Sequence, residues 1–358
     1  APKKVAPAFK RALKRAATQI ESFHRQQLPK SWIDKSRPGT VLGQLVNPVD
    51  VAGVYVPGGQ GGQTPLVSSV LMGGIPAKIA GVKQVIMVTP PTTDGAVNPH
   101  LLVAARMAGI ANIYKVGSAW AIGAMAYGTA TIPKTDVIVG PGNIYVTLAK
   151  KVVAGTVGID MIAGPSEVLV IADASANPEY IAADLLSQAE HDPLASALLV
   201  TVSGDLAQAV AQAVQRQLES LPRKAIALQS LQRFGAILVV PEIDRAFDLA
   251  NRFAPEHLEL HIADPFEHIG RVRNAGAVFM GPYTPEPVGD YIAGPNHVLP
   301  TAGTARFASA LAVDHFLKKT SLIHYSKAAF KKEALDIARL AEIEGLSAHA
   351  NSIKVRLS

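Results

Sequence analysis

The stretch "VAGVYVPGGQGGQTPLVSSVLMGGIPAKIAGVKQVIMVTPP" (residues 51–91) contains the pattern that decides the fold. It opens with a short apolar run that ends in glycines, continues with a helix-like segment over 64–81, and closes with a second apolar run that stops at two prolines. Both apolar runs are continuous, as is typical of strands that are buried on both faces of a parallel sheet. The stretch therefore predicts a strand–helix–strand unit of an α/β fold.

The same alternation continues along the chain. A helix is predicted over 98–110, because Asn98 is a suitable cap and proline is favoured at the first helical position. After "AGPSE" (163–167) a second series of alternating elements begins, with a predicted strand over 168–175 and a predicted helix over 177–191. We therefore predict the α/β class, with two tandem Rossmann-like doubly wound domains. The more charged tail, whose helix ends at Gly345, is predicted to be a small helical unit.

Composition excludes several classes of protein. The chain has 358 residues, of which 49% are hydrophobic and 17% charged, so it can bury a large core and is not predicted to be disordered. It contains no cysteine, which excludes disulfides, thiolate metal ligands and a cysteine nucleophile, and which fits the reducing cytoplasm that we predict as its location. It has no apolar run suited to a membrane span and no signal-peptide pattern.

Positive charge is concentrated at the N-terminal side. Residues 1–40 hold ten Lys or Arg and two acidic residues, whereas the remaining chain carries a formal charge of −2. A basic arm for nucleic acid is one interpretation. We favour an amphipathic helix with basic residues on its wet face, and expect no nucleic-acid partner, because apolar residues recur at helical spacing: Phe9, Leu13, Ala16, Ile20 and Phe23.

Two glycine-rich loops follow predicted strands. Neither "PGGQGGQT" (57–64) nor "GPGN" (140–143) has the spacing of a G-x-G-x-x-G fingerprint, and the first lacks the lysine of a P-loop. Both lie at carboxyl ends of strands, where open α/β sheets bind ligands. From their sequence alone they remain either ligand loops or plain turns.

The segment "LLSQAEHDP" (185–193) brings polar groups to a predicted helix. Asp184, Gln188 and His191 are spaced to share one helical face, which could be a metal-binding or substrate-binding wall. The plainer interpretation is an exposed polar face near a helix end, where a histidine suits the helix dipole. Read alone, the segment favours the plainer interpretation.

Three further segments combine groups able to carry protons or bind metals. "FAPEHLEL" (253–260) contains adjacent acid and imidazole groups, "PVGDYIAGPNHVLPT" (287–301) has little periodic structure, and "GLSAHANS" (345–352) follows a helix end. With no thiolate present, such a donor set suits a catalytic zinc better than a structural one. The candidate residues in these segments are Glu256, His257, Asp290, His297 and His349, and Glu344 closes the helix just before the third segment.

Taken together, the motifs resemble those of the histidinol dehydrogenase family from about residue 10 to residue 354. Chains of that family usually start several tens of residues earlier, so the resemblance implies that an N-terminal helical segment is missing here. The motifs occur in this order: "VYVPGG", "SSVLM", "IPAKIAGV", "GPGNIYVT", "GIDMIAGPSE", "LLSQAEHD", "APEHLEL", "GDYIAGPNHVLPT", "GTARF" and "EGLSAHANSI".

This resemblance implies a homodimeric enzyme that oxidises L-histidinol through the aldehyde to L-histidine with two NAD⁺, in the last step of histidine biosynthesis. It implies one zinc ion per subunit, bound by Gln188, His191, Asp290 and, from the partner subunit, His349. Glu256 and His257 would be the acid/base pair. The substrate would contact these ligands and His257, together with Ser166, His297 and, across the interface, Glu344.

On the NAD side, the resemblance implies contacts with Tyr55, Trp120 and Asn143. The chain departs from the family here, because Trp120 stands where glutamine is common and the loop at 57–64 is about three residues longer. An indole can stack on a flat ring but cannot replace an amide hydrogen bond. The departures concern the cofactor contacts and leave the predicted metal and acid/base residues unchanged.

The resemblance also assigns domains. Residues 1–54 and 167–313 would form a discontinuous first α/β domain with the metal and acid/base residues, 55–166 a second domain on the NAD side, and 314–358 a helical dimerisation unit. Two alternatives remain. One is a paralogous zinc- and NAD-dependent dehydrogenase for another small polar alcohol, and the other is a binding protein that keeps zinc and ligand without catalysis.

Overall fold

The computed structural model describes residues 5–59 and 64–357, so that residues 60–63 of the first glycine-rich loop lie outside the described part. The chain divides into two compact units. The larger unit comprises Ala1–Gln27 and Val49–Phe316, and the smaller comprises Leu28–Pro48 and Leu317–Ser358.

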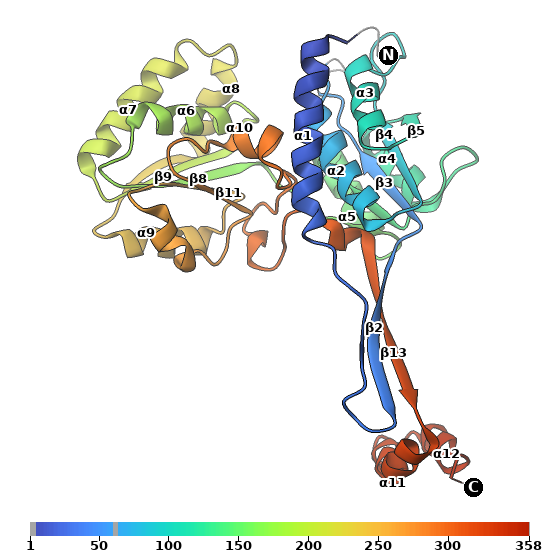
Figure 1. The fold of residues 1–358 in the computed structure, drawn as a ribbon. Helices are drawn as coiled ribbons and strands as arrows, with labels where there is room; N and C mark the ends of the chain where they lie inside the picture. Colours follow the sequence, from blue (N-terminus) through green and yellow to red (C-terminus); the bar gives the residue numbers. More distant parts are fainter. Residues whose placement is uncertain (1–4, 60–63, 358) are drawn as a thin grey trace. The chain divides into compact units, whose positions relative to one another are not determined.

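The larger unit contains two five-stranded parallel sheets (Figure 1). In each sheet the first strand is central, the next two lie on one side and the last two on the other, so both halves are doubly wound as predicted. The first sheet has the order β5-β4-β3-β6-β7, from β3 (Val51–Tyr55), β4 (Gln84–Thr89), β5 (Asn112–Lys115), β6 (Val137–Val139) and β7 (Gly158–Ile159). The second has the order β10-β9-β8-β11-β12, from β8 (Glu167–Ala172), β9 (Ser196–Thr201), β10 (Gly235–Val239), β11 (His257–His261) and β12 (Ala277–Met280).

Helices connect the strands, and the predicted caps are present. The side chain of Asn98 accepts a hydrogen bond from His100 N at the start of α3, and Asn177 accepts one from Glu179 N at the start of α6. The connecting helices are α2 (Val67–Ala80), α3 (Pro99–Met107), α4 (Ser118–Tyr127), α5 (Ile144–Val153), α6 (Pro178–Ala189), α7 (Gly204–Leu218), α8 (Lys224–Phe234) and α9 (Ile243–Phe253).

The second sheet is covered differently on its two faces. Helices α6, α7 and α8 pack against Val168, Val170 and Leu199, whereas α9 packs against Leu169 and Leu258 on the other face. Figure 1 shows these helices on either side of β9, β8 and β11. Because side chains alternate along a strand, every second residue of β11 faces α6.

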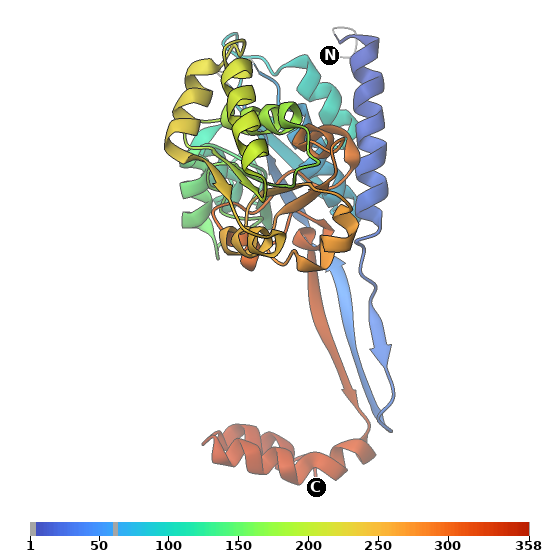
Figure 2. The same ribbon diagram turned by 90° about the vertical axis from the view of Figure 1, so that its left-hand side faces the viewer.

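Helix α1 (Pro7–Arg25) confirms the amphipathic interpretation of the basic N-terminal stretch. Its buried stripe contains Leu13, Ala16 and Ile20, and it lies against α2 and α3 (Figure 2). The last buried position is occupied by His24, while Phe23 is 41% exposed, so the predicted stripe is shifted by one residue at this end.

The smaller unit differs from the predicted helical tail. It contains the helices α11 (Lys327–Ile343) and α12 (Ser347–Lys354), but also an antiparallel sheet of order β1-β2-β13. The strands are β1 (Trp32–Asp34), β2 (Thr40–Pro48) and β13 (Leu317–Tyr325), and β13 pairs with β2 over nine residues. Strand β13 is exposed at most positions, so it lacks the apolar alternation of a half-buried strand, and its sequence does not reveal the distant partner β2.

The predicted domain boundaries are corrected in two places. Strand β3 pairs with β4 and β6, so Val51 onwards belongs with the sheet of the second predicted domain and not with residues 1–54. Residues 40–48 pair with 317–325, so they belong with the C-terminal tail. Among the described residues, no helix is long and apolar enough to cross a lipid bilayer.

Candidate functional site

A cavity of about 880 Å³ lies between the two sheets of the larger unit. This volume is in the range of small-molecule and cofactor sites. From the first half it is lined by Gly59, Thr64 and Pro141, and from the second half by Ser166, His191, Glu256, His257, Asp290 and His297. Six of the residues predicted as metal, acid/base or substrate groups therefore share one cavity.

The two sheets present opposite edges to this cavity. Gly59 and Pro141 follow β3 and β6, at the carboxyl edge of the first sheet where the strand order reverses. Ser166 and Glu256 instead directly precede β8 and β11, at the amino edge of the second sheet. The glycine-rich loops thus follow the usual rule for open α/β sheets, whereas the polar groups of the second half lie at the other strand end.

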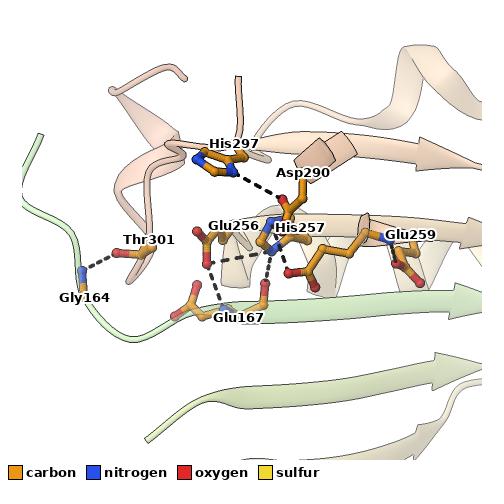
Figure 3. A network of polar contacts seen from close by, with 9 residues as sticks. Gly164, Glu167, Glu256, His257, Glu259, Asp290, His297 and Thr301 are labelled. Atoms are coloured by element: carbon orange, nitrogen blue, oxygen red, sulfur yellow. Dashed lines mark hydrogen bonds and ion pairs between the residues drawn. The ribbon is translucent and has the colours of Figure 1, made fainter. Parts of the chain in front are cut away.

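One ring nitrogen of His257 is fixed by a hydrogen bond, and the other is not (Figure 3). Its Nδ1 lies 3.0 Å from the carbonyl oxygen of Glu167, which can only accept, so Nδ1–H donates and Nε2 carries the lone pair. Nε2 lies 3.9 Å from a carboxylate oxygen of Glu286 and has no hydrogen-bond partner. Burial lowers the pKa of His257 to about 4, so the ring is neutral at pH 7 and Nε2 can accept a proton.

Glu256 is held beside this ring as an acid. One carboxylate oxygen accepts a hydrogen bond from Glu167 N at 3.0 Å and lies 3.7 Å from His257 Nδ1. Burial raises the pKa of Glu256 to about 8, although hydrogen bonds from Glu167 and Ser166 oppose the shift. Burial therefore shifts the two pKa values in opposite directions: the imidazole of His257 is harder to protonate, and the carboxyl group of Glu256 is harder to ionise.

The segment after β12 brings in a second set of groups. Asp290 lies in a π-helical turn, η4 (Gly289–Ala293), which follows the short helix α10 (Glu286–Val288), and such turns are frequent at functional sites. Its carboxylate lies 4.0 Å from Nδ1 of His297, whose Nε2 is buried without a partner. Burial raises the pKa of Asp290 to about 6 and that of Glu286 to about 9, and lowers that of His297 to about 4.

Helix α6 places Gln188 and His191 differently from the plainer interpretation of "LLSQAEHDP". Gln188 is completely buried, and both its amide oxygen and its amide nitrogen lack hydrogen-bond partners. His191 follows the helix and lines the cavity. A buried amide without partners is costly, so the segment is not an exposed polar face.

Of the predicted zinc ligands, only Asp290 belongs to a cluster of side chains able to hold a cation among the described residues. His257, Glu286 and Asp290 each offer an atom within 4.8 Å of the others, and they are one of the two such groups among the described residues. Gln188 and His297 also have buried side-chain nitrogen or oxygen atoms without hydrogen-bond partners. Nitrogen and oxygen ligands without thiolate are consistent with zinc.

The predicted NAD contacts lie on the first half. Tyr55 ends β3, is buried, and accepts a hydrogen bond at its hydroxyl from Ser118 N at 3.2 Å. Asn143 caps α5 after the "GPGN" loop, and Trp120 on α4 is 78% exposed. Gly140 permits the close approach of this loop to β3, since a Cβ at its φ of +115° would lie 2.1 Å from Tyr55 O. A helix start behind a tight loop suits a pyrophosphate.

Two predicted residues belong to the smaller unit. Glu344 is the C-cap residue of α11 and His349 lies on α12, and both side chains are exposed. The structure describes them within that unit only, so their part in a shared site remains a prediction.

Two residues of the site were not singled out from the sequence. Glu167 orients both Glu256 and His257, and Glu286 contributes a buried carboxylate beside His257. The sequence signal for Glu286 was weak, because it stands in a proline-rich turn with no periodicity. Glu167 acts through its backbone N–H and C=O, which no side-chain motif can reveal.

Comparisons with known proteins agree on one family. The family model described as "Histidinol dehydrogenase" matches residues 1–357. A histidinol dehydrogenase of Desulfotalea psychrophila is 59% identical over 98% of this chain and 81% of that protein, and one of Carboxydothermus hydrogenoformans is 56% identical over 99% and 83%.

A solved structure gives the same result. The crystal structure of histidinol dehydrogenase from Elizabethkingia anophelis superposes with a TM-score of 0.94, covers 99% of this chain and 81% of that chain, and shares 43% sequence identity. The arrangement of both sheets is therefore that of an experimentally known fold.

Proposed function

Because the chain belongs to the histidinol dehydrogenase family, we propose that it oxidises L-histidinol through the aldehyde to L-histidine with two NAD⁺. The observation that best supports this beyond the family is that His257, which lines the cavity together with the buried carboxyl group of Glu256, has an Nε2 without a hydrogen-bond partner. A base and a second proton carrier are what two successive oxidations at one carbon require.

The bound cofactors would be held by separate groups: zinc by Gln188, His191, Asp290 and a second subunit's His349, and NAD⁺ by Tyr55, Trp120 and Asn143. When bound, NAD⁺ accepts hydride and zinc holds the amino alcohol in position. A neutral amide ligand would keep the centre cationic toward neutral nitrogen donors.

The chain's own residues would divide the proton transfers. His257 Nε2 removes the hydroxyl proton in the first oxidation, and its low pKa means that the proton is released again at neutral pH. Glu256, once ionised, removes a proton from the water that adds to the aldehyde. Ser166 and Glu167 hold that carboxyl group, while His297 offers its free Nε2 to the substrate.

The stoichiometry of turnover tests this function. The zinc-loaded protein with NAD⁺ and L-histidinol should form about two NADH for each histidine, measured by absorbance and amino-acid analysis. Absence of NADH with histidinol, together with NADH formation from another small polar alcohol, would instead support the paralogous dehydrogenase. Zinc and ligand binding with no oxidation of any alcohol would support the non-catalytic alternative.

The second oxidation should depend on pH through Glu256. Burial raises the pKa of this carboxyl group to about 8, so the base form increases as pH rises through that value, or through a lower one beside a bound cation. We expect the rate of histidinaldehyde oxidation to increase over this pH range in the wild-type protein. The Glu256→Gln variant should not show this increase. An unchanged pH profile in the variant would contradict the assignment.

A further prediction concerns an active site that is shared between two subunits. We propose a homodimer in the cytoplasm in which Glu344 and His349 of one copy complete the site of the other. His349→Ala and Asp290→Ala chains, each inactive alone, should then regain activity when mixed, because one of the two sites in a mixed dimer is intact. Native mass spectrometry would verify mixed dimers, and their inactivity would count against sharing.

A further inference from the structure

One face of β11 is ionisable where a core strand is normally apolar. His257, Glu259 and His261 are buried and alternate with Leu258 and Leu260, which pack toward α9. On the neighbouring strand β8, the positions that face α6 are Val168, Val170 and Ala172. Burying three ionisable groups in this layer costs free energy. Apolar packing therefore does not explain why these residues stand at these positions.

His261 lies between two buried carboxylates. Its Nε2 is 3.4 Å from Asp184 Oδ2 on α6 and 3.4 Å from Glu259 Oε2 on its own strand. Burial disfavours a charged ring, yet Asp184 and Glu259 outweigh it and raise the pKa of His261 to about 9. Both ring nitrogens of His261 lack hydrogen-bond partners, so its close approach to the carboxylates of Asp184 and Glu259 is the polar link that joins α6 to β11 inside the core.

Each acidic member is connected to a segment that carries a site residue. Asp184 stands one helical turn before Gln188, which puts the two side chains on one face of α6. Glu259 stands two residues after His257 on the same face of β11. The other carboxylate oxygen of Glu259 accepts a hydrogen bond from Glu286 N at 3.1 Å, in the short helix that leads to Asp290 (Figure 3).

We propose that Asp184, Glu259 and His261 form a buried ionic triad of positioning residues, which holds α6, β11 and the segment 286–290 in the mutual arrangement that the site needs. The assignment of Gln188, His191 and Asp290 as zinc ligands rests on the proposed function, whereas the three contacts of the triad do not. The triad acts through the segments and touches neither substrate nor cofactor.

A second metal ion is the competing interpretation of the same cluster. The three side chains offer atoms within 4.8 Å of one another. Structural zinc sites normally have four protein ligands, and the cluster supplies three among the described residues.

The test compares His261→Gln and Asp184→Asn with Glu179→Gln, a control that removes an exposed carboxylate from the same helix. In the metal-free full chain, hydrogen exchange at the Glu286 amide and in the last turn of α6 should be at least roughly tenfold faster in both triad variants and unchanged in the control. Zinc affinity, measured by titration with the metal alone, should fall by roughly 10–100-fold in the triad variants.

Several outcomes would overturn the triad. Unchanged rates of hydrogen exchange in the folded variants would contradict the triad. Binding of a second zinc ion by the wild type, but not by His261→Gln, would also contradict it. Zinc affinity within twofold of wild type would show a merely structural role. If wild type binds no zinc, the proposed function fails, while the exchange experiment still decides the triad. Asp184→Asn, at the edge of the cluster, provides the measurement if His261→Gln does not fold.

Discussion

Replacing His257 with asparagine should slow histidinol oxidation by roughly 10²–10⁴-fold while zinc binding stays intact. The asparagine amide can still donate to the carbonyl oxygen of Glu167, as Nδ1 does at 3.0 Å, but it has no nitrogen in the place of Nε2. Only the proton acceptor is therefore removed. Single-turnover formation of NADH from histidinol measures the first step directly, and equilibrium dialysis measures zinc.

The matched control for this variant is His268→Asn. His268 stacks on Phe247 and does not line the cavity, so its replacement should leave the first step unchanged. A rate for His257→Asn within threefold of wild type would show that another group is the base.

Replacing Glu256 with glutamine should slow histidinaldehyde oxidation by roughly 10²–10⁴-fold and change histidinol oxidation by no more than a few-fold. Glutamine keeps an oxygen that accepts from Glu167 N, but it cannot take a proton from water. Supplying the alcohol or the aldehyde in separate single-turnover experiments isolates the two steps.

Exposed Glu267 provides the control, because Glu267→Gln makes the same chemical change away from the cavity. Equal losses in the two steps would mean that Glu256 and His257 act as one unit and that the division of roles is wrong.

Local sequence patterns were sufficient for most of the fold. Continuous apolar strands, the Asn98 and Asn177 caps and the restart after "AGPSE" predicted two doubly wound halves, and both sheets have that order. The antiparallel pairing of β2 with β13 escaped prediction, because β13 is too exposed to show apolar alternation and its partner lies far away in the sequence.

For the site, spacing showed which residues could act, and family resemblance suggested their roles. It did not show that Gln188 is buried without amide partners, nor that the backbone of Glu167 sets the tautomer of His257. Glu286 was missed, because its proximity to His257 depends on the path of the chain after β12.

By itself, the sequence determined the α/β class, the tandem halves and the chemical types available at the site, because these follow from local periodicity and residue identity. The tertiary fold brings the carboxyl edge of one sheet to face the amino edge of the other across one cavity, which no local pattern encodes. The fold also determines which ionisable side chains are buried away from solvent. Burial and neighbouring charges, which no linear pattern contains, set the pKa values of Glu256 and His257 in opposite directions.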